Sequence, residues 1–290
     1  MTPPAPVTLP RTEVHSFTSI ATGEPFQIWI GHPLHGWASR EGDAPRVLYL
    51  LDANLFFGVA VEMTRIMHMM FGELPPILVV GIAYPDTDPV RQARLRTGHF
   101  TPSPDATFAE AARALSPPGT PKPDPPPMGG ADDFLHFLRQ QVDPWVRDRF
   151  TVTDGDATLF GSSLGGLFAV HVLRTAPEWV DHIIAASPSL WWNEDELLRQ
   201  VGESRVKGAG DPARRRLPDV VLAVGSGEEG PAVPQLNRYK LITNTRRLLE
   251  HLSTGHLPAR SAHLEIIDGE SHTSVVPSAL TRGLRRLLAP

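Results

Sequence analysis

Short continuous runs of apolar residues recur along the chain and predict its strands. Such a run is typical of a strand that is covered on both faces, because neither of its sides meets water. These runs lie at residues 47–51, 77–82, 157–160, 182–186, 220–224 and 264–267. Two segments near the amino terminus, 14–19 and 26–31, alternate in apolar character instead, so we expect an antiparallel pair of strands near an edge of the sheet.

Longer segments between these runs repeat apolar residues at helical spacing. The expected helices lie at about 57–71, 131–150, 164–175, 194–201, 235–251 and 275–288. This repeated alternation of strands and helices predicts an α/β fold, with a mostly parallel central sheet and helices on both of its faces. The 290 residues suit a single domain over 1–290, since one α/β core commonly reaches this length.

Residues 101–130 break this alternation because they are crowded with proline. Proline runs stand at 117–118 and 125–127, and proline has no backbone N–H to contribute to a sheet. We therefore expect a long excursion over the surface. Long loops inside a compact domain are commonly functional, so we expect this Pro-rich segment to form a flap beside the active site.

The composition excludes several classes of function. The net charge is −5 and no long basic stretch occurs, which argues against a nucleic-acid partner; the arginine cluster at 214–216 is interpreted as solvated surface. Because the chain has no cysteine, disulfides, thiolate metal sites and a cysteine nucleophile are excluded. The sequence shows no phosphate-binding glycine loop and no clustered metal ligands, so we expect neither a cofactor nor a metal.

The sequence shows neither a membrane span nor a secretory signal. It contains no uninterrupted apolar stretch of about 18 residues, which a transmembrane helix needs. Its first residues lack a basic segment followed by an apolar run. With Met1 as the natural start, we expect a cytoplasmic protein. The sequence does not address the oligomeric state.

The strongest chemical signal is the G-x-S-x-G pattern at residues 161–165. A predicted strand ends just before it and a helical pattern begins just after Ser163, which is the strand–turn–helix context of a nucleophilic serine. We expect Ser163 to be the nucleophile. Close approach of the strand and the helix is expected to favour glycine at Gly161 and Gly165. Ser162 occupies the variable position, and its side chain is expected to point elsewhere.

His272 is the histidine best placed to act as the base for Ser163. It follows the last predicted strand and precedes the last helix, so its loop can bring the imidazole to the same edge of the sheet. The third member should be an acid that follows the preceding strand. Glu228 and Glu229 both satisfy this, and the residues alone leave the choice open. Asp268 is a weaker alternative that can simply shape its turn.

A serine nucleophile also needs two backbone N–H groups directed at the developing negative charge. One is expected from Leu164, the residue after the nucleophile. The other is expected from the loop that follows the strand at 47–51, within residues 52–54. Together these groups would form an oxyanion hole.

The order of motifs over most of the chain resembles the esterase-D-like branch of the α/β hydrolases, particularly the siderophore esterases that open catecholate trilactones. The matching segments are YLLDAN at 49–54, VVGIAYP at 79–85, RLRTGHFTP at 94–102, GGADDFLHFL at 129–138, FGSSLGGLFAV at 160–170, SPSLWW at 187–192, VGSGEEG at 224–230 and GESH at 269–272. The resemblance implies an α/β-hydrolase fold and a serine hydrolase that acts on carboxylic ester bonds.

The resemblance also implies roles for single residues. It selects Glu228 as the acid, because the acid of the family lies three residues after the glycine that ends the strand. It assigns the second oxyanion N–H to Asn54, although Ala53 stands where the family usually has glycine. It places Arg96 near the substrate and Trp191 at the border of the pocket. Arg96 could instead hold its own loop, and Trp191 could belong to the core.

The function expected from these features is an esterase that works through an acyl-enzyme at Ser163. Its partner would be a small-molecule ester, for which a ferric siderophore is one candidate. Ser162 and the segment around His99 depart from the family pattern, which loosens the choice of substrate. An esterase for small or aryl esters, an acyltransferase of the same fold and a non-catalytic ligand-binding protein that retains the fold remain as alternatives.

Overall fold

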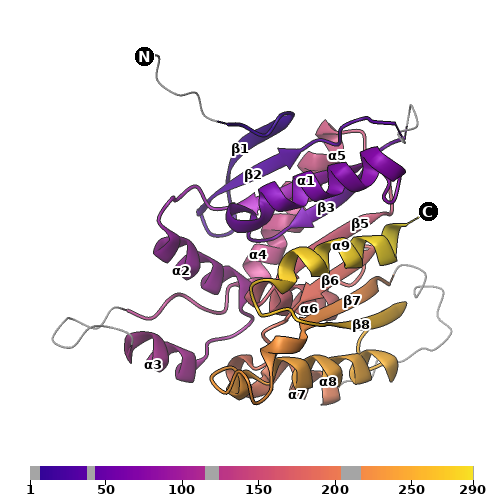
Figure 1. The fold of residues 1–290 in the computed structure, drawn as a ribbon. Helices are drawn as coiled ribbons and strands as arrows, with labels where there is room; N and C mark the ends of the chain where they lie inside the picture. Colours follow the sequence, from indigo (N-terminus) through magenta and orange to yellow (C-terminus); the bar gives the residue numbers. More distant parts are fainter. Residues whose placement is uncertain (1–6, 38–42, 115–123, 204–216, 290) are drawn as a thin grey trace, which may run out of the picture.

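An eight-stranded sheet forms the centre of the computed structural model, which describes residues 7–37, 43–114, 124–203 and 217–289. Its strands are β1 (Thr12–Thr18), β2 (Pro25–Gly31), β3 (Arg46–Leu50), β4 (Ile77–Ala83), β5 (Ala157–Ser162), β6 (His182–Ala186), β7 (Asp219–Gly225) and β8 (Ser261–Ile267). They are ordered β1-β2-β4-β3-β5-β6-β7-β8 across the sheet (Figure 1). β2 pairs antiparallel with β1 and β4, and the remaining pairs are parallel. The mostly parallel α/β-hydrolase sheet predicted from the sequence is confirmed.

Helices cover both faces of the sheet, because alternate residues of a strand point to opposite sides. Along β3, Leu48 and Leu50 belong to one apolar cluster, whereas Val47 and Tyr49 belong to the other. The helices over the first cluster are α1 (Ala53–Phe71) and α9 (Val275–Leu288). The helices over the second cluster are α4 (Ala131–Phe137), α5 (Asp143–Arg149), α6 (Leu164–Thr175), α7 (Trp192–Glu203) and α8 (Leu241–Ser253).

Two helices, α2 (Pro89–Phe100) and α3 (Ala106–Ala114), are absent from the sequence prediction. α2 begins with a proline in its first turn, and the Asp88 side chain accepts a hydrogen bond from the Val90 N–H, so its start is well capped. However, α2 buries only its last turn, and α3 buries only Ala109 among its described side chains. So few buried positions do not produce the apolar stripe from which a helix is recognised.

The segment predicted as one helix at 131–150 contains a change of helix type. α4 continues into a π-helical turn at Leu138–Val142, which leads directly into α5. Pro144 lies just beyond this turn. Proline has no N–H to bond to the carbonyl four residues earlier, and its ring clashes with that carbonyl in a regular α-helix. The wider π turn therefore lets the segment remain helical on both sides of the proline.

The Pro-rich segment is anchored to the body of the protein where it begins. The Trp192 Nε1–H donates to the Ser103 carbonyl at 2.9 Å, and the Asn193 N–H donates to Asp105 Oδ2 at 2.8 Å. α3 follows at once, so this part of the segment is helical. Residues 115–123 and the arginine cluster at 214–216 lie outside the described residues. That the segment acts as a flap, and that 1–290 forms one domain, stay predictions.

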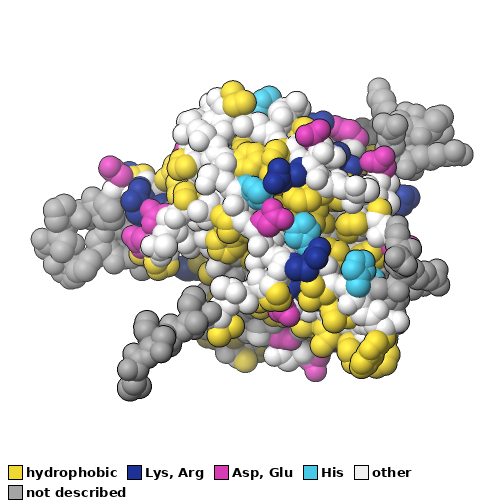
Figure 2. Space-filling view, turned by 90° about the horizontal axis from the view of Figure 1, so that it is seen from above, with side chains coloured by type: hydrophobic (Ala, Val, Ile, Leu, Met, Phe, Trp, Pro, Cys, Tyr) yellow, Lys and Arg dark blue, Asp and Glu magenta, His cyan; other side chains and the backbone are white. Residues whose placement is uncertain are grey.

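The helices and surface of the described residues bear on the predicted location and partners. No helix among them is both long enough and apolar enough to cross a bilayer. On the face shown in Figure 2, acidic, basic and histidine side chains are interspersed with apolar ones rather than gathered by sign. The cytoplasmic location and the lack of a nucleic-acid partner stay predictions.

Candidate active site

Ser163 lies at the sharp turn between β5 and α6. Its backbone has φ 58° and ψ −116°, a conformation that side-chain-bearing residues rarely adopt and that is found mostly at functional sites. The turn is held by a hydrogen bond from the Ser163 N–H to the Ala186 carbonyl at 2.9 Å. A Cβ atom on Gly161 would lie 2.1 Å from the Gly165 carbonyl oxygen. Glycine is therefore required at Gly161, as the sequence predicts.

The second glycine of the motif is not required by packing, contrary to our expectation. A Cβ atom on Gly165 would lie 3.5 Å from Asp52 Oδ2, which is an ordinary van der Waals distance. The crowded position is Gly166, where a Cβ atom would lie 2.9 Å from the Pro188 Cα atom. α6 thus approaches the loop after β6 most closely at Gly166, the residue that follows the motif.

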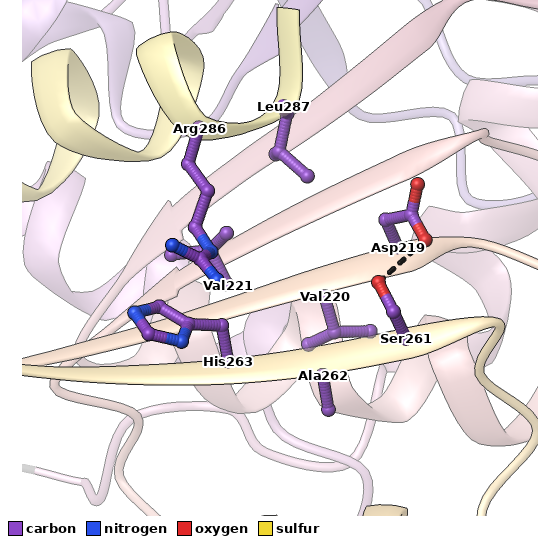
Figure 3. A pocket seen from close by; sticks show the side chains of 8 residues that line it. All are labelled: Asp219, Val220, Val221, Ser261, Ala262, His263, Arg286 and Leu287. Carbon is purple, nitrogen blue, oxygen red and sulfur yellow. Dashed lines mark hydrogen bonds between the residues drawn. The ribbon is translucent and has the colours of Figure 1, made fainter.

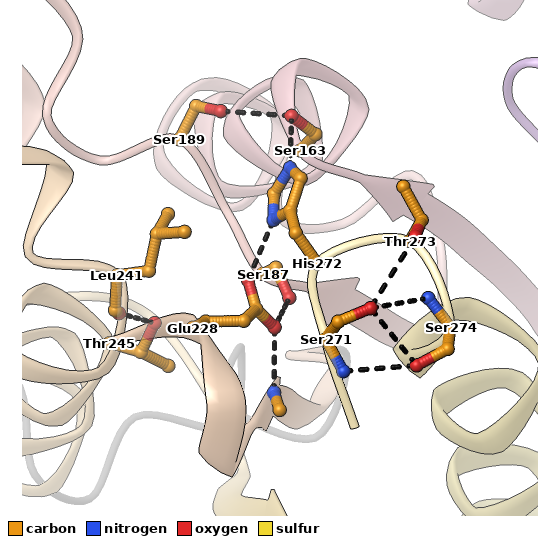
Figure 4. A network of polar contacts seen from close by, with 11 residues as sticks. Ser163, Ser187, Ser189, Glu228, Leu241, Thr245, Ser271, His272, Thr273 and Ser274 are labelled. Atoms are coloured by element: carbon orange, nitrogen blue, oxygen red, sulfur yellow. Dashed lines mark hydrogen bonds and ion pairs between the residues drawn. The ribbon is translucent and has the colours of Figure 1, made fainter. Parts of the chain in front are cut away.

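Three predicted side chains come together at the carboxyl edge of the sheet (Figure 4). Ser163 Oγ lies 3.2 Å from His272 Nε2, and His272 Nδ1 lies 2.6 Å from Glu228 Oε2. The Glu228 side chain is fully buried, whereas 32% of the His272 side chain is exposed. Glu228 Oε1 accepts two further hydrogen bonds of 2.6 Å, from the Ser187 hydroxyl and the Gly225 N–H. His272 is therefore positioned to accept the proton of the Ser163 hydroxyl, and Glu228 is positioned to orient His272.

The other two acidic candidates are occupied elsewhere. Glu229 accepts hydrogen bonds from the N–H and the hydroxyl of Thr243 on α8, at 2.8 and 2.6 Å. Asp268 accepts a hydrogen bond from the Ser226 hydroxyl at 3.2 Å. The geometry therefore favours Glu228 as the acid.

Glycines bring the loop of the acid against the loop of the histidine. A Cβ atom on Gly225 would lie 2.2 Å from the Glu270 carbonyl oxygen. The Gly227 N–H donates to the same oxygen at 2.9 Å. Both contacts require that the backbone after β7 approach the backbone after β8 very closely. This close approach positions Glu228 beside His272.

The two expected oxyanion N–H groups lie at neighbouring helix starts. α1 begins at Ala53 and α6 at Leu164, and the strands that lead into them, β3 and β5, are adjacent in the sheet. The N–H groups of Asn54 and Leu164 are both in the first turn of their helices, where no carbonyl of the same helix can accept them. The Asn54 side chain exchanges two hydrogen bonds with the Tyr84 backbone, of 2.8 and 2.9 Å, and so holds this turn in place.

Arg96 is bonded to the loop that carries Asn54. Its guanidinium donates to Asp52 Oδ1 at 2.8 Å and to Asp52 Oδ2 at 2.7 Å. A longer contact of 3.4 Å reaches the Ser162 carbonyl. Burial lowers the pKa of Arg96, but attraction to Asp52 outweighs it, so the pKa is raised above its usual value and the cation persists. Arg96 thus ties the loop of residues 52–54 to the turn at Ser163. The contact with substrate that the resemblance implies stays a prediction.

Replacing Arg96 with methionine is expected to destabilise the fold by about 3 kcal/mol, because the buried Asp52 carboxylate then lacks its cation. The double variant Arg96→Met/Asp52→Asn is expected to recover most of this loss, since it removes the charge that was left unpaired. Urea unfolding of both variants beside the unmodified protein measures the two effects. Equal stability of Arg96→Met and the unmodified protein would contradict this structural role.

Trp191 lies two residues after a serine that contacts Ser163. Ser189 Oγ is 3.2 Å from Ser163 Oγ. The Trp191 ring is half-buried and packs against Tyr239, with ring centroids 4.7 Å apart. It lies both at the edge of the core and on the wall of a cleft that also includes Phe108. A contact between Trp191 and substrate stays a prediction.

Three residues that contact the predicted site were not expected to do so from the sequence. They are Asp52, which pairs with Arg96, and Ser187 and Ser189, which contact Glu228 and Ser163. Ser187 follows β6 directly and Ser189 lies two residues further on, at the same edge of the sheet as Ser163. Polar residues at successive strand ends in a parallel sheet are a signal that could have indicated them.

A cavity of about 510 Å³ lies near the starts of β7 and β8, at the edge of the sheet opposite to Ser163 (Figure 3). Its lining includes Asp219, Ser261, His263 and Arg286. Asp219 begins β7, whereas Glu228 follows the end of that strand, so this cavity is remote from the triad. Among the described residues, no group of three metal-ligating side chains is arranged to hold a metal ion.

Known proteins resemble this chain over nearly its whole length. The family described as "Putative esterase" matches residues 19–286. The chain is 31% identical over 294 residues to ferri-bacillibactin esterase BesA of Bacillus subtilis (strain 168), which covers 98% of this chain and 91% of that protein. It is 32% identical over 284 residues to a siderophore enterobactin esterase of Emericella nidulans, with 90% and 88% covered. The solved structure of siderophore hydrolase EstB from Aspergillus nidulans superposes with a TM-score of 0.78 at 28% identity, covering 99% of this chain and 97% of that one.

Proposed function

The chain belongs to the esterase family that matches residues 19–286, and we propose on this basis that it is a siderophore esterase that cleaves trilactone esters through an acyl-enzyme at Ser163. Support for the substrate class comes from relatives that are named for siderophore ester cleavage and that align over almost all of the chain. The observation that carries the mechanism is the hydrogen-bonded series Ser163–His272–Glu228. No cofactor is needed for this chemistry.

The first half-reaction forms the acyl-enzyme. Ser163 Oγ donates its proton to His272 Nε2 as it attacks the ester carbonyl carbon. The N–H groups of Asn54 and Leu164 stabilise the negative charge that develops on the carbonyl oxygen. The protonated imidazole, held by Glu228 through Nδ1, then gives its proton to the departing alkoxide. An ester remains on Ser163 and the alcohol leaves.

The second half-reaction returns the free enzyme. His272 removes a proton from water, which attacks the acyl carbon with the same two N–H groups on the oxyanion. The proton passes back to Ser163 Oγ as the carboxylic acid departs. A trilactone contains three equivalent ester bonds, so the same cycle can open it and then cleave the linear products.

Glu228→Gln is expected to lower kcat by about 10³- to 10⁴-fold, with a small change in KM. The amide cannot stabilise the imidazolium, and its N–H₂ group favours the wrong tautomer of His272. The matched control is Glu229→Gln, because that side chain bonds to Thr243 instead. Hydrolysis of an activated aryl ester measures both variants. An equal loss in the two variants, or a loss confined to Glu229→Gln, would contradict the assignment of the acid.

A hydrolysis panel followed by mass spectrometry tests the substrate. We expect ferric or iron-free trilactone siderophores to be cleaved with a kcat/KM at least 100-fold above that of simple aryl esters. Preference for the simple esters would overturn the siderophore assignment and leave the mechanism in place. Greater transfer to an added alcohol than to water would identify an acyltransferase. Failure of a fluorophosphonate probe to label Ser163 would favour a non-catalytic binding protein.

A further inference from the structure

Ser189 carries a buried hydroxyl group that has no part in the proposed half-reactions. Only 1% of the residue is exposed, and its Oγ atom lies 3.2 Å from Ser163 Oγ (Figure 4). Within the parts of the chain that the structure describes, no other group forms a hydrogen bond with this hydroxyl. The Ser189 hydroxyl is therefore directed at the oxygen that attacks the ester.

The direction of this hydrogen bond follows from the hydrogens available along the series. An ionised carboxylate only accepts, so His272 Nδ1 carries the hydrogen that bonds to Glu228 Oε2, and His272 Nε2 is left as an acceptor. The single hydroxyl hydrogen of Ser163 is then donated to His272 Nε2. Ser189 must therefore be the donor in its contact with Ser163 Oγ.

The loop after β6 holds the Ser189 hydroxyl in this position. Its first residue, Ser187, has a left-handed backbone with φ 43°. Such strained residues persist where surrounding contacts impose them. Here the Ser187 N–H donates to the Ala223 carbonyl at 2.7 Å, and the Ser189 N–H donates to the Ser163 carbonyl at 3.0 Å. The backbone of the loop is thus bonded to the same turn that carries the nucleophilic oxygen.

The effect of this donor differs between the two half-reactions because its acceptor changes. In the free enzyme Ser163 Oγ is a hydroxyl oxygen, which accepts a hydrogen bond well. In the acyl-enzyme it is the alkoxy oxygen of an ester, which accepts poorly because its lone pair is delocalised into the carbonyl group. When the acyl group departs, the bond between Oγ and the acyl carbon breaks and its electron pair returns to Oγ. The hydrogen bond from Ser189 therefore strengthens most between the acyl-enzyme and this transition state, and only such a gain accelerates a reaction.

We propose that Ser189 is a catalytic residue of deacylation, whose hydroxyl donates a hydrogen bond to Ser163 Oγ as this oxygen leaves the acyl carbon. His272 supplies the proton that Oγ takes up, and Ser189 keeps its own hydrogen. The hydroxyl thus stabilises the negative charge that develops on Oγ. Burial strengthens this hydrogen bond, because the site has a lower dielectric constant than water. The proposal rests on the proposed esterase function and adds a second donor for the oxygen that is released.

Ser189→Ala tests the proposal, because the two half-reactions of para-nitrophenyl acetate hydrolysis can be measured separately. Stopped-flow release of nitrophenol measures acylation, and the lifetime of the acetyl group on Ser163, followed by mass spectrometry of the quenched protein, measures deacylation. We expect deacylation to slow about 10- to 100-fold, as for the loss of one hydrogen bond to a charged group, and acylation to change less than about threefold. Because deacylation then limits turnover, kcat and KM should fall together while kcat/KM stays nearly constant.

Ser187→Ala is the matched control, because it removes another buried hydroxyl from the same loop. The Ser187 hydroxyl donates to Glu228 Oε1 at 2.6 Å, so its loss acts through His272, which serves both half-reactions. We expect acylation and deacylation to slow by the same factor in this variant, and kcat/KM to fall with kcat. The same pattern in Ser189→Ala would show that Ser189 only supports the triad.

A longer-lived acyl-enzyme in Ser189→Ala, with acylation nearly unchanged, would support the proposal. Equal lifetimes in Ser189→Ala and the unmodified protein, or equal slowing of both half-reactions, would overturn it and leave the esterase mechanism in place. Failure of a fluorophosphonate to label Ser163 in the unmodified protein would overturn the proposed function and this proposal with it. Ser189→Cys, which keeps the shape of the side chain but has only a weak donor, gives the same test if the alanine variant does not fold.

Discussion

Ser163→Ala is expected to reduce kcat for ester hydrolysis by about a million-fold while the protein remains folded. The variant lacks the oxygen that, in our mechanism, attacks the ester carbonyl carbon and carries the acyl group. The Asn54 and Leu164 N–H groups remain, so a small residual rate above that in water is expected. Hydrolysis of an activated aryl ester under single-turnover conditions measures the loss.

Ser162→Ala is the matched control for this experiment. Ser162 is the adjacent serine; it is buried at the end of β5, and the hydrogen-bonding partners of the His272 ring are Ser163 and Glu228 instead. We expect it to retain activity within a few-fold and to be labelled by a fluorophosphonate, whereas Ser163→Ala should not be labelled. Full activity in Ser163→Ala, or its loss in Ser162→Ala alone, would contradict the assignment of the nucleophile.

The positions of Ser163 and His272 in the fold could be predicted from the sequence because each depends on local order along the chain. Ser163 stands where an apolar run changes to a helical pattern, and β5 and α6 meet there in the structure. His272 stands between the last strand and the last helix, and its position at the carboxyl edge follows from the parallel sheet. Once the direction of the strands is known, residues that follow them must lie at one edge.

Contacts between distant segments could not be predicted in this way. The partners of the two side chains distinguish Glu228 from Glu229. Glu228 contacts His272, whereas Glu229 contacts Thr243 on α8. The sequence resemblance favoured Glu228, but its two hydrogen bonds from Ser187 and Gly225 are visible only in the structure. Periodicity describes which face of an element is buried, and it carries no information on such pairings.

The residues around Arg96 illustrate a second limit. α2 buries too little apolar surface to be recognised, so the helix that carries Arg96 was not predicted. Without that helix, neither the Arg96–Asp52 pair nor the link to the Ser162 carbonyl can be derived from the sequence. A helix that buries little apolar surface is positioned largely by hydrogen bonds and ion pairs, which produce no periodic pattern in the sequence.

His272→Ala is expected to reduce kcat nearly as much as Ser163→Ala, by about 10⁵- to 10⁶-fold. Without the imidazole, no group takes the proton of Ser163 Oγ. The fully buried Glu228 cannot replace it, because the His272 ring separates the Glu228 carboxylate from Ser163 Oγ. His263→Ala is a suitable control, because His263 lies on β8 and lines the remote cavity of Figure 3. Its activity should stay close to that of the unmodified protein.

Two further measurements separate loss of the base from local disorder. The His272 side chain is partly exposed, so added imidazole can reach the space left in His272→Ala and should raise its rate, but not that of Ser163→Ala. Because the two residues act in one step, the double variant Ser163→Ala/His272→Ala should be no slower than Ser163→Ala alone. Multiplicative losses in the double variant would show that His272 contributes independently of the Ser163 proton, and the proposed proton transfer would then be wrong.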